Sequence, residues 1–133
     1  MNTVLRSALA VAAATFATQA AAEITFYEND GFHGRSFSAT RQVDNFERNG
    51  FNDRASSVVV VMDRWEVCSD AHFAGNCVVL RPGRYDSLSA LGMNDRISSA
   101  RVVGGNAHVD NGRYAPAPVS YGDYRRRDRD VCR

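Results

Sequence analysis

Residues 51–57 read Phe-Asn-Asp-Arg-Ala-Ser-Ser, and 42 positions later residues 93–99 read Met-Asn-Asp-Arg-Ile-Ser-Ser. An earlier pair of segments, residues 32–34 (Phe-His-Gly) and 73–75 (Phe-Ala-Gly), repeats at an offset of 41. Self-similarity at a fixed period is typical of a chain built from duplicated structural units. The sequence therefore predicts one domain, residues 23–103, made of two motifs at 23–62 and 63–103.

The apolar runs in both copies are short and rich in β-branched and aromatic residues, as expected of strands. They cover residues 24–27, 58–62, 77–80 and 100–103. Glycines at turn-like intervals separate them, and no run has the length or the 3.6-residue period of a helix. We expect an all-β domain in which two four-stranded units pack their apolar faces together as a sandwich.

The first motif opens with Ile-Thr-Phe-Tyr-Glu-Asn-Asp-Gly-Phe-His-Gly at residues 24–34, and residues 65–75 look like a second opening of the same kind. This aromatic-x4-aromatic-x-Gly pattern resembles the signature of a Greek-key motif in the βγ-crystallin superfamily. The resemblance runs over residues 23–103 and implies two Greek-key motifs packed as a βγ-crystallin-like sandwich. Two positions depart from the pattern: Cys68 replaces the first aromatic of the second signature, and Val43 stands opposite Tyr85, the tyrosine-corner position.

The repeated Asn-Asp-x-x-Ser-Ser loops gather the oxygen donors that calcium requires, because calcium takes about six to eight oxygen ligands. Neither loop has the spacing of an EF-hand. Asn, Asp and Ser are also common in turns that bind no metal, but their recurrence at matching places in the repeat favours calcium. The candidate ligands are Asn52, Asp53, the main-chain carbonyl of Arg54, and Ser56 in the first loop, and Asn94, Asp95, the carbonyl of Arg96, and Ser98 in the second.

The resemblance adds further expectations about these loops. In calcium-binding βγ-crystallins, each loop completes its ligand shell with oxygen atoms from the first hairpin of the other motif. This implies that Ser69 and Asp70 serve the first loop, and that Glu28 and Asn29 serve the second. The final serines, Ser57 and Ser99, are implied to bond within the fold, and serine at the fifth position of both loops implies two competent calcium sites.

The first 22 residues have the pattern of a signal peptide. Arg6 supplies positive charge, residues 8–16 are apolar, and Ala20-Ala21-Ala22 forms a small-residue cleavage site. The apolar stretch is too short to span a bilayer, and no later stretch is long enough. We expect a mature protein that begins at Glu23, lacks a membrane span, and is secreted or periplasmic.

Cys68 and Cys77 flank residues 69–76, and in an oxidising compartment such a pair can close a hairpin with a disulfide. The rival interpretation, a zinc site of Cys68, His72 and Cys77, lacks an evident fourth ligand. Cys132 then remains unpaired and could link two chains as a dimer.

The composition argues against nucleic acid as a partner, since 16 basic residues meet 15 acidic residues for a net charge of +1. Residues 104–133 contain Gly, Pro, Tyr and Arg with few aliphatic residues, so we expect a flexible tail. Its Arg-rich end could contact an acidic surface, but the interleaved Asp123, Asp128 and Asp130 favour a solvated tail.

No nucleophile, metal-hydrolase or phosphate-binding motif is present in the sequence, so an enzyme is not expected. The leading hypothesis is a calcium-binding structural module that the ion stabilises and that presents a surface to an envelope or matrix component. The alternative is an exported inhibitor or toxin-like protein-binding module on the same scaffold, but its candidate loop at 40–49 lacks an obvious anchor beyond Phe46. A hydrolase ranks third.

Overall fold

The computed structural model describes residues 21–104 and 107–116. The predicted all-β fold is confirmed: helical structure in this part of the chain is limited to short 3-10 turns, η1 (Phe46–Asn49), η2 (Ala71–Phe73), η3 (Leu88–Leu91) and η4 (Asn111–Arg113). Residues 1–20 of the predicted signal peptide lie outside the described residues. Cys132 and the end of the predicted tail lie outside them as well. The strands are β1 (Glu23–Asn29), β2 (His33–Ala39), β3 (Ser57–Val61), β4 (Arg64–Asp70), β5 (Ala74–Leu80), β6 (Gly83–Tyr85) and β7 (Ser99–Val103).

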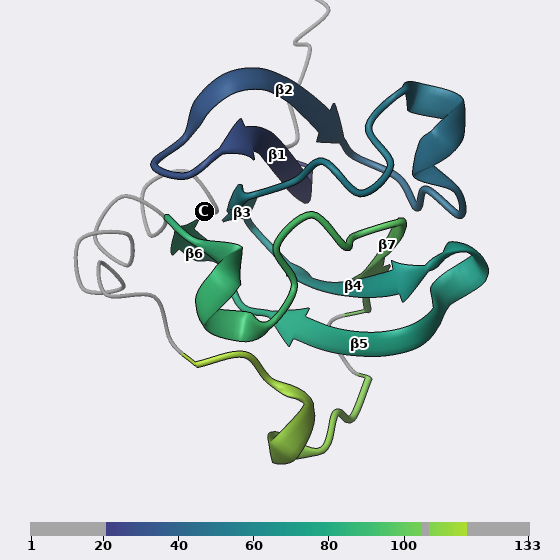
Figure 1. Cartoon of the computed structure of the whole chain (residues 1–133). Coiled ribbons are helices and arrows are strands. Elements are labelled where there is room, and N and C mark those ends of the chain that lie inside the picture. Colours follow the sequence, from purple (N-terminus) through teal and green to yellow (C-terminus); the bar gives the residue numbers. More distant parts are fainter. Residues whose placement is uncertain (1–20, 105–106, 117–133) are drawn as a thin grey trace, which may run out of the picture.

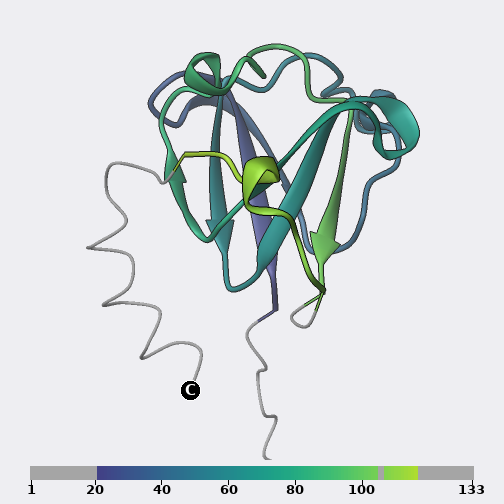
Figure 2. The same ribbon diagram turned by 90° about the horizontal axis from the view of Figure 1, so that it is seen from below.

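Two antiparallel sheets form the sandwich, one with the order β2-β1-β3-β6 and the other with the order β5-β4-β7. The sheets face each other at an angle (Figures 1 and 2). Each motif begins with a hairpin, β1–β2 in the first and β4–β5 in the second. On its other edge, the first strand of each hairpin pairs with the last strand of its own motif, β1 with β3 and β4 with β7.

The third segment of each motif contacts the sheet of the other motif. In the second motif this segment is β6, which pairs with β3 of the first motif and places Tyr85 opposite Val58. The matching residue of the first motif, Val43, forms an isolated bridge to Ala100 of β7. The first sheet therefore contains a strand of the second motif, and the second sheet receives an isolated bridge from the first motif.

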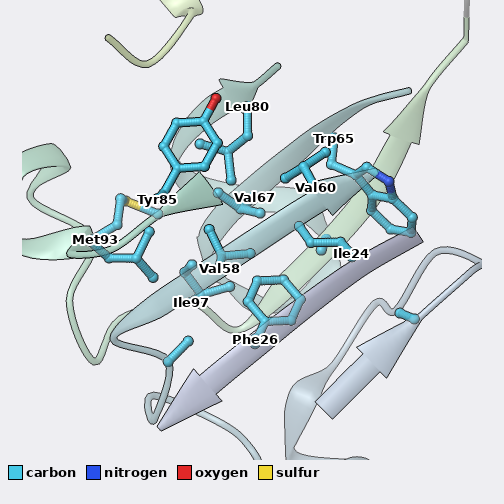
Figure 3. Packing of buried hydrophobic residues seen from close by; sticks show 14 of the residues in the cluster. Ile24, Phe26, Val58, Val60, Trp65, Val67, Leu80, Tyr85, Met93 and Ile97 are labelled. Carbon is cyan, nitrogen blue, oxygen red and sulfur yellow. The ribbon is translucent and has the colours of Figure 1, made fainter. Parts of the chain in front are cut away.

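The core lies between the two sheets. Alternate residues of β1, β3 and β4 point inward, and Phe26, Val58 and Trp65 are fully buried there (Figure 3). Tyr85 is also buried, and its hydroxyl donates a hydrogen bond of 2.8 Å to the Arg81 carbonyl. Burial of these large aromatic side chains supplies much of the hydrophobic stabilisation of so small a domain.

The structure differs from the expected flexible tail over residues 107–116. This segment follows β7 and runs along β5 (Figure 1), where the Ala115 amide donates to the Val79 carbonyl at 2.9 Å and Tyr114 forms a parallel bridge with Val79. Arg113 forms an ion pair with Glu66, and Ala115 is buried. Few aliphatic residues are needed for this docking, because one aromatic ring, one arginine and backbone hydrogen bonds supply the contacts.

None of the helical turns in residues 21–104 and 107–116 has the length or the apolar character that a bilayer span would require.

Candidate metal centre

The two repeated loops lie against each other, each just before the last strand of its motif. Their backbones exchange hydrogen bonds: the Asp53 amide donates to the Ile97 carbonyl at 3.2 Å, and the Asp95 amide donates to the Ala55 carbonyl at 2.9 Å. The side chains of Ala55 and Ile97 are fully buried and anchor both loops in the core. The two loops therefore form one structural unit.

The aspartate of each loop reaches the serine of the other. The Ser98 hydroxyl donates to Asp53 Oδ1 at 3.0 Å, and the Ser56 hydroxyl lies 3.3 Å from Asp95 Oδ1 in the matching contact. Both aspartates adopt the left-handed backbone region, with φ of 54° and 51°. Asp tolerates this region better than most residues do, because its short polar side chain bonds locally. The backbone turn thus directs each carboxylate across the loop pair.

Two open depressions lie beside this loop pair. The first is lined by Glu28, Asn52, Asp53, Arg54 and Asp95. The second is lined by Asp53, Ser69, Asp70, Asp95 and Arg96. Each depression thus has three carboxylate residues in its lining, and the two loop aspartates belong to both.

The expected pairing of hairpins with loops is wrong in this structure. Glu28 lies beside the first loop, whereas Ser69 and Asp70 lie beside the second, so each hairpin faces the loop of its own motif. The cause is strand pairing: β3 runs beside β1 and β7 beside β4, which brings the end of each loop next to its own hairpin. Contacts between the two motifs do occur at this site, but they are formed by Asp53 and Asp95 of the loops and not by the hairpins.

Asn29 and Asn94 do not line either depression. The main-chain oxygen of Asn29 accepts a hydrogen bond of 2.7 Å from the Ser57 hydroxyl. Asn94 donates to Asp95 Oδ2 at 3.2 Å, as Asn52 does to Asp53 at 3.1 Å. These amides therefore orient the aspartate side chains that follow them in the sequence.

The last serine of each loop bonds within the fold, as predicted. The Ser57 hydroxyl donates to the Asn29 carbonyl and accepts from the Phe32 amide at 3.0 Å. The Ser99 hydroxyl donates to the Asp70 carbonyl at 2.6 Å and accepts from the Phe73 amide at 3.0 Å. These bonds hold the hairpin turns beside the depressions.

The charges at the two depressions are not identical. Glu28 is flanked by two arginines, with Arg54 Nη1 at 3.5 Å from one carboxylate oxygen and Arg35 Nε at 3.7 Å from the other. A cation in the first depression would compete with these largely exposed guanidinium groups, whose contacts are weak because water screens them. At the equivalent position in the second motif stands Ser69, followed by Asp70.

The donors at both depressions suit a hard cation. Carboxylate, amide and hydroxyl oxygens converge there, and the hydrogen bonds that Asp53 and Asp95 receive come from neutral Ser and Asn groups, which do not cancel their charge. Calcium accepts such mixed oxygen shells in open, irregular geometry, whereas magnesium requires a near-ideal octahedron. The residues present therefore fit calcium, although their role as ligands stays a prediction.

The cysteine pair does not provide a zinc site. Cys68 and Cys77 form the predicted disulfide, with an S–S distance of 2.10 Å, so neither sulfur is a thiolate ligand. His72 instead lies 3.5 Å from an oxygen of Asp44. The Glu66 carboxylate is close to both sulfurs, but it is paired with two arginines.

Sequence reasoning missed the dual position of Asp53 and Asp95 and the assignment of each hairpin to its own loop. The repeat contains a partial signal for the second point, since Glu28 and Asn29 match Ser69 and Asp70 at the same offset of 41 that relates the hairpins. The exchange of aspartates depends on the contact between loops that lie 42 residues apart, and no local pattern reports such a contact.

Comparison with known proteins gives consistent relatives. The beta/gamma crystallin family model matches residues 23–103. Epidermal differentiation-specific protein of Cynops pyrrhogaster is 38% identical over 80 residues, which cover 60% of this chain and 23% of that protein. Gamma-crystallin S of Macropus fuliginosus is 29% identical over 96 residues, which cover 71% of this chain and 51% of that protein. The chain thus spans about half or less of the length of these curated relatives.

A solved βγ-crystallin structure from an archaeon is 34% identical to this chain with a TM-score of 0.59, and the match covers 63% of this chain and all of that one (100%). The region matched by the family model begins with β1 and ends with β7, so it includes both hairpins, both loops and β6. The chain therefore belongs to the beta/gamma crystallin family.

Proposed function

We propose that this protein is a non-enzymatic structural module that binds two calcium ions, one at each depression beside the paired loops. The observation that carries the proposal is the duplicated oxygen-lined depression, in which Asp53 and Asp95 line both sites. In the first site Glu28, Asn52, Ser56 and the Arg54 carbonyl would join them, and in the second Ser69, Asp70, Ser98 and the Arg96 carbonyl.

Bound calcium would act on the fold through these residues. Each ion would neutralise carboxylates that stand close together and would fasten a hairpin to the loop pair. With three carboxylate residues lining each site, two of them shared, and an open geometry, we expect dissociation constants of about 10⁻⁶ to 10⁻³ M, the range of moderate and extracellular calcium modules. The ion would bind the folded chain and so raise its stability, by about 2.7 kcal/mol per site at a hundredfold excess over the dissociation constant.

Export to the periplasm or the medium, and a surface offered to an envelope or matrix component, are part of the same proposal. They rest on the signal-like first 22 residues and on the balance of charge. The alternative of an inhibitor-like binding loop has less support, because Phe46, its expected anchor, is fully buried in the core and cannot reach a partner.

Calorimetric titration and thermal melting of the mature protein test the proposal. Calcium is expected to bind at two sites and to raise the melting temperature, while magnesium at the same concentration has a much smaller effect. Ser56→Arg should remove the first site and Ser98→Arg the second, because a long cationic side chain would occupy the depression. Asp110→Asn, at an exposed carboxylate paired with His108, is the matched control and should bind as the parent does.

Absence of binding heat together with an unchanged melting temperature at millimolar calcium would refute the proposal. Equal loss of both sites in each serine variant would instead show that the two depressions do not bind separate ions.

A further inference from the structure

The two hairpins beside the depressions are equivalent in backbone but differ in one covalent bond. In the second hairpin, Cys68 lies opposite Cys77 in the β4–β5 ladder, and the two form the disulfide. The positions 41 residues earlier are Tyr27 and Ser36, which lie opposite each other in the β1–β2 ladder. The protein thus contains an internal comparison between a hairpin with a disulfide and one without.

The disulfide lies at the point where the second hairpin holds the second loop. The Cys68 carbonyl accepts a hydrogen bond of 2.9 Å from the Ser98 amide. In the first motif the Tyr27 carbonyl accepts the matching bond of 2.8 Å from the Ser56 amide. Ser56 and Ser98 are the serines whose hydroxyls contact the shared aspartates, so each carbonyl positions one serine of the metal centre.

The hairpin tips have few regular backbone bonds of their own. The β4–β5 register shifts between Cys68 and Asp70, and residues 72, 73 and 75 all have positive φ. The first hairpin has the same irregularities, but there the ring of Tyr27 packs edge-on against Phe32 with centroids 5.8 Å apart. Cys68 stands where that tyrosine would be, so in the second hairpin the disulfide takes the place of the aromatic contact.

We infer that the Cys68–Cys77 disulfide is a redox-sensitive cross-link that sets the cation affinity of the second depression. Its reduction leaves the cation affinity of the first depression unchanged. The inference rests on the proposed function. Ser69 and Asp70, which line the second depression, follow Cys68 directly and are enclosed by the disulfide loop. Opening the loop frees the tip, and calcium must then order it on binding.

The reductant is a dithiol. Its thiolate attacks Sγ of Cys77, the half-buried partner, and expels the thiolate of the fully buried Cys68. The second thiol of the reductant then displaces Cys77 from the mixed disulfide. The products are two protein thiols and the oxidised, disulfide form of the reductant, so two electrons and two protons pass to the protein.

The test uses the mature full-length chain with Cys132→Ser, which removes the third cysteine. In this background the Ser56→Arg variant retains only the second calcium site, and the Ser98→Arg variant retains only the first. Each variant is titrated with calcium before and after reduction by dithiothreitol, with removal of the reductant and blocking of the free thiols. We expect reduction to weaken binding roughly five- to tenfold in the Ser56→Arg variant, as for a modest coupling between sites, and to leave the Ser98→Arg variant unchanged.

Cys68→Ser/Cys77→Ser in the Ser56→Arg background should reproduce the weak binding without any reductant. This variant excludes an effect of the blocking groups. Equal weakening of both depressions, or an unchanged affinity of the second depression, would overturn the inference.

Amide hydrogen exchange without metal separates this inference from the proposed function. Reduction should speed exchange at the Ser98 and Phe73 amides, which bond to Cys68 and Ser99, and leave the Ser56 and Phe32 amides unchanged. If no variant binds calcium, the proposed function fails. A change in exchange confined to the second hairpin still supports the stabilising role of the disulfide there, and an equal change in both hairpins overturns it.

Discussion

Asp53 and Asp95 connect the backbone of the loops to their chemistry. Each occupies a left-handed backbone position, receives an amide hydrogen bond from the asparagine before it, and contacts the serine of the other loop. One residue type therefore serves both a turn that few side chains tolerate and a negatively charged depression. This dual use explains why the Asn-Asp-x-x-Ser-Ser motif is compatible both with a turn that binds no metal and with a calcium-binding loop.

Gly75 is the single residue whose replacement most directly tests the hairpin geometry. Its φ is +79°, and a β-carbon there would lie 2.4 Å from Ser69 Oγ and 2.7 Å from Asp70 Oδ2. We predict that Gly75→Ala lowers the free energy of unfolding by about 2–4 kcal/mol, because strain and a clash add. It should also weaken calcium binding at the second depression. Denaturant unfolding and calcium titration measure the two effects.

Gly92→Ala is the matched control for that substitution. Gly92 has a similar φ of +67°, but nothing lies within 4 Å of the position of the added β-carbon. The backbone penalty alone should cost about 1 kcal/mol. Equal destabilisation by the two substitutions would show that the close approach of the added β-carbon to Ser69 and Asp70 does not affect stability.

At the scale of elements, residues 107–116 cover the outer face of the sheet formed by β5, β4 and β7. Trp65 and Leu80 pair on the core face, so the next pair, Glu66 and Val79, points to the opposite face. Both are nonetheless buried, with the Glu66 side chain 4% exposed. Arg113 and Arg101 pair with Glu66, and the Arg81 guanidinium lies 3.7 Å from the Tyr114 ring centre. This segment is part of the folded domain.

Arg113→Met should detach this segment. Removing one arginine leaves the buried Glu66 carboxylate with Arg101 as its remaining ion-pair partner, which we expect to cost about 1–3 kcal/mol of unfolding free energy. Arg48→Met breaks an exposed ion pair with Asp44 and serves as the control, with an expected change within about 0.5 kcal/mol. Urea denaturation gives both values, and amide exchange at Ala115 should rise in Arg113→Met alone. A change in Arg113→Met no larger than in the control would mean that the ion pair does not hold the segment.

At the scale of the whole molecule, contacts that cross between the motifs make them interdependent. The first sheet takes β6 from the second motif, and Val43 of the first motif bridges to β7 in the other sheet. The loops add further contacts of this kind through Asp53 and Asp95. Folding and any metal binding therefore belong to the complete domain and not to a single repeat.

A peptide of residues 23–62 should consequently remain unfolded. It lacks β6 beside β3 and lacks Trp65, Leu80 and the rest of the facing sheet, so its strands have no surface on which to bury their apolar side chains. Circular dichroism should show no cooperative melting transition, with or without calcium. The full domain is the positive control, and cooperative folding of the isolated motif would contradict the role assigned to the contacts between the motifs.

Much of this protein is determined by local sequence. The repeat, the short β-branched runs and the glycines that require positive φ predict the strands, the hairpins and the all-β class, because these features depend on residues close together in the chain. The cysteine pair likewise predicted its own disulfide across one hairpin. The loop motif identified the residues of the candidate metal centre, although not how they are combined.

How the residues of the candidate metal centre come together was decided by the tertiary structure. Each hairpin faces its own loop, each aspartate crosses to the other loop, and residues 107–116 dock on a sheet whose outer face the sequence does not distinguish from any exposed face. These contacts join residues 26 to 47 positions apart, and their free energy comes from the packing of the two sheets. No window of sequence contains both partners of such a contact, so the shared position of Asp53 and Asp95 between the two depressions becomes visible only in the folded domain.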